Sequence, residues 1–201
     1  SRKEFYRNTN NLDLFTGDYV CVDSSTGFDI GTVSATGEIV RLQLKKYRVR
    51  EDSEEMRGIQ RVATERDMER REEAKSKEDQ TLERARTIAF SLNLQMKISD
   101  IEIQGDGRKA IFFYTAESRV DFRELIKRYA DEFKVKIEMR HISYREEASR
   151  LGGTGVCGRE LCCSTWLTDY KQVNTGAARV QNLSINMEKL AGQCGRLKCC
   201  L

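Results

Sequence analysis

Two short segments of the chain carry three cysteines each, at the same spacing. Residues 157–163 and 194–200 both read Cys-Gly-Arg-x-x-Cys-Cys, and six of the seven cysteines belong to them. These six are Cys157, Cys162, Cys163, Cys194, Cys199 and Cys200. Thiolates bind zinc, copper(I) and iron–sulfur clusters. The duplicated spacing therefore predicts that the six cysteines ligate a metal or a cluster.

The residues that follow the first cysteine of each copy suit such a site. Gly158 and Gly195 come directly after it, where the free backbone of glycine lets the chain curl around an ion. Arg159 and Arg196 come next. A cation beside thiolates lowers their pKa and offsets the negative charge of a cysteine-ligated centre.

The number of sulfurs leaves two arrangements open. A tetrahedral zinc or a four-iron cluster needs four ligands, so four of the six cysteines could hold one metal. Alternatively, each triplet holds its own centre with a fourth ligand from another chain. Spacing favours neither zinc nor iron–sulfur, although the Cys-x-x-Cys knuckle typical of zinc sites is absent. Disulfides, buried free thiols and thiol redox chemistry are the remaining interpretations, and no signal-peptide pattern favours an oxidising compartment.

Composition describes a charge-rich chain of 201 residues, with 39% hydrophobic and 33% charged residues. That length suffices for one or two domains with a real core. No apolar run approaches the roughly 20 residues of a membrane helix. The net charge of +3 is too small to argue for nucleic-acid binding by itself.

The first 50 residues predict a small, strongly bent sheet. Three strands are expected, with turns at Ser24–Gly27 and Thr36–Gly37, and they cover residues 19–22, 28–33 and 38–44. Cys21 lies in the first strand among apolar residues. We therefore interpret it as a core thiol and not as a ligand.

Residues 51–86 form a charge-dense block in which acidic and basic residues are mixed. This pattern predicts a long solvated helix. Ile59 and Val62 would give its early turns an apolar side, and an apolar stripe from Leu82 to Leu92 would dock its later turns.

Residues 98–140 predict a compact α+β unit. Strands at 98–104 and 109–115 flank the turn Gly105–Gly107, a helix follows, and residues 134–140 alternate as a half-buried strand. Asp121 and Glu124 are expected to form a capping box at the start of that helix. Helix–strand–strand–helix–strand is the order of a small α+β sandwich.

His141 is the only histidine, and its place at a strand end favours a structural role over metal binding. No catalytic acid–base pair can be assembled from the sequence.

The predicted fold is therefore α+β in three parts. Residues 1–50 form a small β subdomain, residues 51–150 a long helix with an α+β core, and residues 151–201 the duplicated cysteine segment. This last part has few charges and clustered glycines, so we expect long loops whose structure depends on the metal. The chain stops one residue after Cys200, and we expect a further C-terminal tail.

Five motifs together resemble the RicT (YaaT) family, the bacterial members of the family named for a yeast polymerase-suppressor protein. They are residues 119–125, 136–140, 152–165 and 181–186 and the second cysteine triplet. The resemblance covers roughly residues 17–201.

The resemblance implies a cytoplasmic, non-enzymatic protein that acts with two small helical partners, RicA and RicF. It implies two 4Fe-4S clusters and a role in RNase Y-dependent mRNA maturation, with effects on sporulation, biofilm formation and competence. The six duplicated cysteines would be cluster ligands, and partner cysteines would supply the rest of the eight that two clusters need. A zinc-stabilised nucleic-acid-binding module and a thiol redox protein are the alternative functions.

Overall fold

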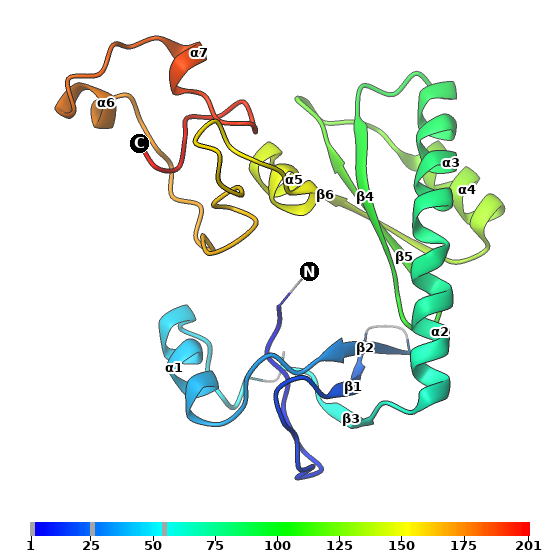
Figure 1. Ribbon diagram of the computed structural model, residues 1–201. Coiled ribbons are helices and arrows are strands. Elements are labelled where there is room, and N and C mark those ends of the chain that lie inside the picture. Colours follow the sequence, from blue (N-terminus) through cyan, green and yellow to red (C-terminus); the bar gives the residue numbers. More distant parts are fainter. Residues whose placement is uncertain (1–2, 25–26, 54–55) are drawn as a thin grey trace.

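The computed structural model describes residues 3–24, 27–53 and 56–201. It contains two three-stranded sheets beside one long helical rod, with the cysteine segment next to the second sheet (Figure 1). This arrangement confirms the predicted α+β class and the loop-dominated cysteine segment. Within the described ranges, no helix is both long and apolar enough to cross a membrane.

The first sheet has the order β2-β1-β3, and all its pairs are antiparallel. β1 (Tyr19–Asp23) and β2 (Phe28–Thr32) confirm the first two predicted strands. Val20, Val22 and Ile59 form its small core. Cys21 in β1 is fully buried, as predicted for a core thiol, and burial raises its pKa.

The predicted third strand at 38–44 is wrong, because these residues form helix α1 (Glu38–Tyr47). Glu38 lies in its first turn and two lysines in its last, the charge order that the helix dipole favours. The third strand is β3 (Ile59–Val62), so Ile59 and Val62 are not the early helical turns we expected. Residues 25 and 26 of the predicted turn and residues 54 and 55 of the charge-dense block lie outside the described residues.

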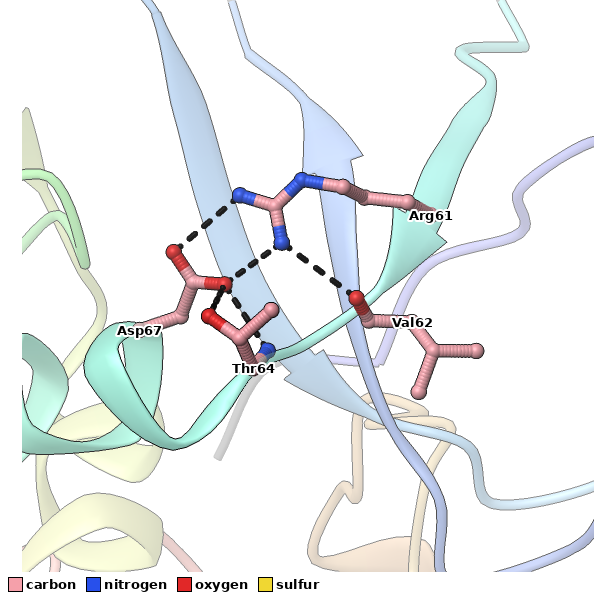
Figure 2. Close-up of polar contacts among 4 residues, drawn as sticks. All are labelled: Arg61, Val62, Thr64 and Asp67. Atoms are coloured by element: carbon pink, nitrogen blue, oxygen red, sulfur yellow. Dashed lines mark hydrogen bonds and ion pairs between the residues drawn. The ribbon is translucent and has the colours of Figure 1, made fainter.

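The helical rod begins directly after β3. Thr64 is the N-cap of α2 (Glu65–Ser76), and the Asp67 carboxylate accepts bonds from the Thr64 N–H (2.8 Å) and hydroxyl (2.7 Å). Arg61 reaches from β3 to the same carboxylate with both Nη atoms, at 2.5 and 3.1 Å (Figure 2). Asp67 therefore joins the end of the first sheet to the start of the helix, and these partners hold its pKa well below its usual range.

α2 continues into α3 (Glu78–Ser91) through Lys77, and the two helices connect the sheets (Figure 1). α2 contacts both β2 and β4. α3 buries Ala85, Ile88 and Ala89, which confirms the predicted apolar stripe of the later turns.

The second sheet has the order β4-β5-β6 and matches the predicted α+β unit. β4 (Lys97–Ile103) and β5 (Lys109–Thr115) form an antiparallel hairpin, and β6 (Lys136–His141) pairs parallel to β5 after α4 (Arg123–Phe133). α3 and α4 contact each other and this sheet, with a core built around the fully buried Phe112, Leu125 and Tyr129.

The capping box expected at α4 does not form. Asp121 accepts a bond from the Arg123 N–H (3.1 Å) and pairs with the Arg123 guanidinium, while Glu124 pairs with Arg128. The helix begins at Arg123, so Asp121 precedes its N-cap residue by one position and Glu124 cannot reach back as in a capping box.

We expect Asp67→Asn to destabilise the folded chain by about 1–3 kcal/mol, because it leaves the Arg61 charge without its partner and weakens the helix cap. Since the pKa of Asp67 is lowered by folding, its contribution is present above the carboxylate's unfolded pKa and is lost as the pH falls. The variant should therefore lose less stability on acidification than the wild type. Urea unfolding followed by circular dichroism at pH 7 and pH 3 measures both effects.

Glu65→Gln is the matched control, because Glu65 lies exposed in the same helical turn. Equal unfolding midpoints for Asp67→Asn and Glu65→Gln at pH 7 would contradict this role of Asp67.

Candidate cysteine-ligated centre

Helix α5 (Tyr144–Leu151) connects the second sheet to the cysteine segment. Ser143 and Glu146 form a capping box at its start. We did not predict this helix, although Ser-x-x-Glu before it is a sequence signal for a helix N-terminus. In Figure 1 it lies between β4 and β6 on one side and the cysteine loops on the other.

One face of α5 is bonded to the sheet through charged side chains. Glu147 accepts a bond from the Ser99 hydroxyl (2.8 Å) and pairs with Lys97 (2.9 Å). Arg150 pairs with two carboxylates of β4 at 2.8 and 2.9 Å and stacks on the Phe113 ring, with its guanidinium carbon 3.5 Å from the ring centroid. Asp100 and Glu102 supply these carboxylates.

The opposite face of α5 is bonded to the cysteine segment. The Ser149 hydroxyl donates to the Cys163 carbonyl oxygen at 2.5 Å, and the Tyr170 hydroxyl donates to the same oxygen at 3.3 Å. Arg145 donates to the carbonyl oxygens of Lys171 (3.3 Å) and Leu197 (3.1 Å). These bonds place the backbone of both cysteine copies against one helix.

The two copies have the same backbone fold. Gly155 N–H donates to the Arg159 carbonyl oxygen at 2.8 Å, and Gly192 N–H donates to that of Arg196 at the same distance. Each copy also carries one isolated antiparallel bridge, Thr154 with Glu160 and Ala191 with Leu197. The sequence duplication is therefore a duplication of structure.

The glycines after the first cysteines take the conformation that was expected of them. Gly158 has φ +77° and Gly195 has φ +71°, a region that residues with a Cβ rarely adopt. The backbone reverses at these points, so that the first cysteine and the cysteine pair of each copy lie on two arms of one tight loop.

The two copies lie next to each other (Figure 1). The Gln193 side chain of the second copy donates to the Thr154 carbonyl oxygen before the first copy, at 3.4 Å. Burial raises the pKa of Cys163, and the nearby Cys199, Cys194 and Cys162 raise it further by charge repulsion. Burial, Cys194 and Cys162 likewise raise the pKa of Cys199, while Arg145 acts to lower it.

Four thiols, two from each copy, are thus close enough for their charges to interact: Cys162, Cys163, Cys194 and Cys199. We call them the inner cysteines. Cys157 and Cys200, the outer cysteines, are exposed. Among the described residues, no group of three or more His, Cys, Asp or Glu side chains is arranged to hold a metal ion. Cysteine sulfurs are suitable ligands for a metal or a cluster, but the six thiols as they stand do not surround a site for one.

The cation that lies beside the inner cysteines is neither of the two that we expected. Arg159 and Arg196, predicted from their sequence positions, are both exposed. Arg145 is buried and acts on Cys199. It was missed because it lies in α5 and not in either cysteine motif.

His141 lies at the end of β6, with its ring edge-on to Tyr114 at 5.4 Å between centroids. It belongs to no group of potential metal ligands in the described part of the chain. The structural role that we favoured for His141 stays a prediction.

The division into residues 1–50, 51–150 and 151–201 also stays a prediction.

We expect Gly158→Ala and Gly195→Ala each to destabilise the cysteine segment by about 1–2 kcal/mol, because a Cβ disfavours the left-handed backbone. Gly31→Ala is the control: a Cβ at Gly31 likewise meets no neighbouring atom within 4 Å, but its φ is not left-handed. Trp166, the only tryptophan, lies in this segment and reports its urea unfolding by fluorescence. Equal effects of all three substitutions would contradict the conformational argument.

In the reduced, metal-free chain, iodoacetamide should modify Cys157 and Cys200 first and Cys21 last, following their exposure. Cys163 and Cys199 should react slowly at pH 8, because a raised pKa leaves less thiolate, and faster as the pH rises toward that pKa. Timed labelling with mass spectrometry measures each rate. Modification of Cys163 as fast as that of Cys157 at pH 8 would contradict this order.

Comparison with known proteins is informative at the level of sequence. The family model for the PSP1 C-terminal conserved region matches residues 57–142, and that for the third domain of PSP1-like proteins matches residues 172–201. The stage 0 sporulation protein YaaT of Bacillus subtilis (strain 168) is 40% identical over 190 residues. The match covers 94% of this chain and 66% of the length of YaaT.

No solved structure matches the chain. The first family model covers β3 to β6, and the second covers the last two short helices, α6 (Gly176–Val180) and α7 (Met187–Leu190), with the second cysteine copy. These matches confirm the resemblance found in the sequence motifs. The chain is a member of the PSP1 family and is similar to YaaT.

Proposed function

We propose that the chain is a regulatory adaptor without enzymatic activity, which holds iron–sulfur clusters jointly with partner subunits. The observation that carries this proposal is the meeting of the two cysteine copies, which are bonded to each other and to helix α5. The proposed ligands are the six duplicated cysteines, Cys157, Cys162, Cys163, Cys194, Cys199 and Cys200. A 4Fe-4S cluster bound there would supply a redox-responsive or oxygen-responsive centre that couples to partner binding.

The chemistry of the donors supports this proposal. Like charges at close range are unfavourable, so four neighbouring thiolates require positive charge among them. A bound metal or cluster iron supplies that charge and holds thiols in their deprotonated form. Without such a charge, burial raises the pKa of Cys163 and of Cys199, and repulsion from Cys194 and Cys162 raises both further.

The surface of the cysteine segment supports shared ligation with partners. The outer cysteines are exposed, and the same segment exposes large apolar side chains: Val156 is 72%, Trp166 71% and Val180 86% exposed. Large apolar side chains exposed on one segment are a feature of many protein interaction sites. We propose that small helical subunits of the RicA and RicF type bind here and supply further ligands.

The cellular role follows from the family. The resemblance to RicT implies that such a complex modulates mRNA maturation by RNase Y in the cytoplasm, and the YaaT relative is named as a stage 0 sporulation protein. We propose the same process for this chain.

A single structural zinc is the alternative that the inner cysteines also favour, because four thiols match a tetrahedral site. The thiol redox function has less support. A reactive cysteine needs a lowered pKa, whereas folding raises the pKa of Cys163 and Cys199.

We expect the chain, purified anaerobically after co-expression with its genomic neighbours, to contain iron and sulfide in equal amounts and to absorb broadly in the violet. Cys194→Ser should remove most of this absorbance and weaken partner co-purification. Cys21→Ala is the control, because Cys21 lies in the core of the other sheet, and its iron content should equal that of the wild type. Elemental analysis, sulfide assay and the visible spectrum are the measurements.

Three outcomes decide between the alternatives. One zinc per chain without visible absorbance would contradict the cluster proposal and support the structural zinc site. Iron content unchanged in Cys194→Ser would remove the cysteine copies as the binding site. A chain that contains no metal under any of these conditions would contradict both metal proposals and leave the thiol redox function.

A further inference from the structure

Arg145 is a buried cation that has no counter-charge among the residues that the structure describes. It lies in the first turn of α5 with 9% of its surface exposed. Its two Nη atoms donate to the carbonyl oxygens of Lys171 and Leu197, and its buried Nε has no hydrogen-bond partner. Within the described ranges of the chain, no carboxylate forms an ion pair with it.

The other charged groups of α5 that face inward show how unusual this is. Arg150, five residues later, pairs with both Asp100 and Glu102. Glu147 pairs with Lys97. Burying a charge without an opposite charge is strongly unfavourable, so an uncompensated buried guanidinium indicates that its counter-charge comes from a bound group.

The surroundings of Arg145 identify that group. Leu197, whose carbonyl Arg145 holds, lies between Cys194 and Cys199 of the second copy. Arg145 therefore lies against the loop that carries the Cys194 and Cys199 thiols. The anion that fits is therefore a thiolate-ligated centre.

We infer that Arg145 is the counter-charge and positioning residue of an anionic thiolate centre at the inner cysteines. One Nη atom holds the loop of the second copy through Leu197, the other holds Lys171, and the buried Nε–H is left without a hydrogen-bond partner. This inference rests on the proposed function and adds a residue that neither cysteine motif contains.

A structural arginine and a counter-charge respond differently to removal. If Arg145 is the counter-charge of a bound centre, Arg145→Met removes an uncompensated buried charge from the metal-free chain. The metal-free variant should therefore unfold at a urea concentration equal to or higher than that of the metal-free wild type. The same variant should bind Co²⁺, a coloured probe of thiolate ligation, about tenfold or more weakly, as losses of outer-shell partners do. Arg145→Lys keeps the charge and should recover part of the affinity.

Two control variants separate these effects. Arg150→Met leaves Asp100 and Glu102 without their cation, so it should destabilise the empty chain. Arg179→Met removes an exposed positive charge from α6 and should leave Co²⁺ affinity unchanged. A less stable Arg145→Met with wild-type Co²⁺ affinity would overturn the inference.

A second readout does not depend on metal uptake. Iodoacetate is anionic and iodoacetamide is neutral. A cation beside Cys199 therefore raises the rate of modification by iodoacetate relative to that by iodoacetamide at this thiol. Arg145→Met should lower this ratio at Cys199 and leave it unchanged at Cys157. The proposed function would fail if the wild type, co-purified with its partner subunits, held no metal. An unchanged ratio at Cys199 would separately overturn the role of Arg145.

Discussion

The cysteine site depends on the two opposite faces of helix α5. At 100° per residue, Arg145 and Ser149 lie on one face, and Glu147 and Arg150 lie on the other. The second pair is bonded to β4, and the first pair holds the backbone of both cysteine copies. In residues 152–201, all of which the structure describes, only two side chains are buried. Such a segment gains little from an apolar core, so its position depends on these hydrogen bonds.

Local signals predicted the second sheet well and the first sheet only in part. Alternation in residues 134–140 and glycines in the hairpin turn each agree with the final structure, because neighbouring residues decide them. β3 is different: its four residues lie within a charge-dense block, and it pairs with β1 nearly forty residues earlier. Residues 38–47 show the converse, since their apolar residues suit a strand, while the charges at both ends favour the helix that forms.

The cysteines of the candidate site were identifiable from the sequence, but the residues around them were not. Spacing identified the cysteines, and Gly158 and Gly195 have the backbone conformation expected of them. Position in the sequence pointed to Arg159 and Arg196 as the cations beside the thiols, but both side chains are exposed. Arg145 lies outside both motifs, and only the packing of α5 against the second copy brings it to Cys199. The Ser143–Glu146 capping box can reveal helix α5 in the sequence, but it does not reveal which part of the chain packs against each face of the helix.

The duplicated copies do not contribute equivalent cysteines. The inner group takes the last two cysteines of the first copy and the first two of the second, and it leaves the outer Cys157 and Cys200 exposed. Cys163 and Cys200 occupy the same place in the repeat, yet only the Cys163 carbonyl is held by Ser149 and Tyr170. An exact symmetry would have paired equivalent thiols at each of two centres. The observed offset instead sets the four inner cysteines, which influence one another's pKa, apart from the two outer ones. It leaves the two outer thiols facing outward, where ligands from another chain can reach them.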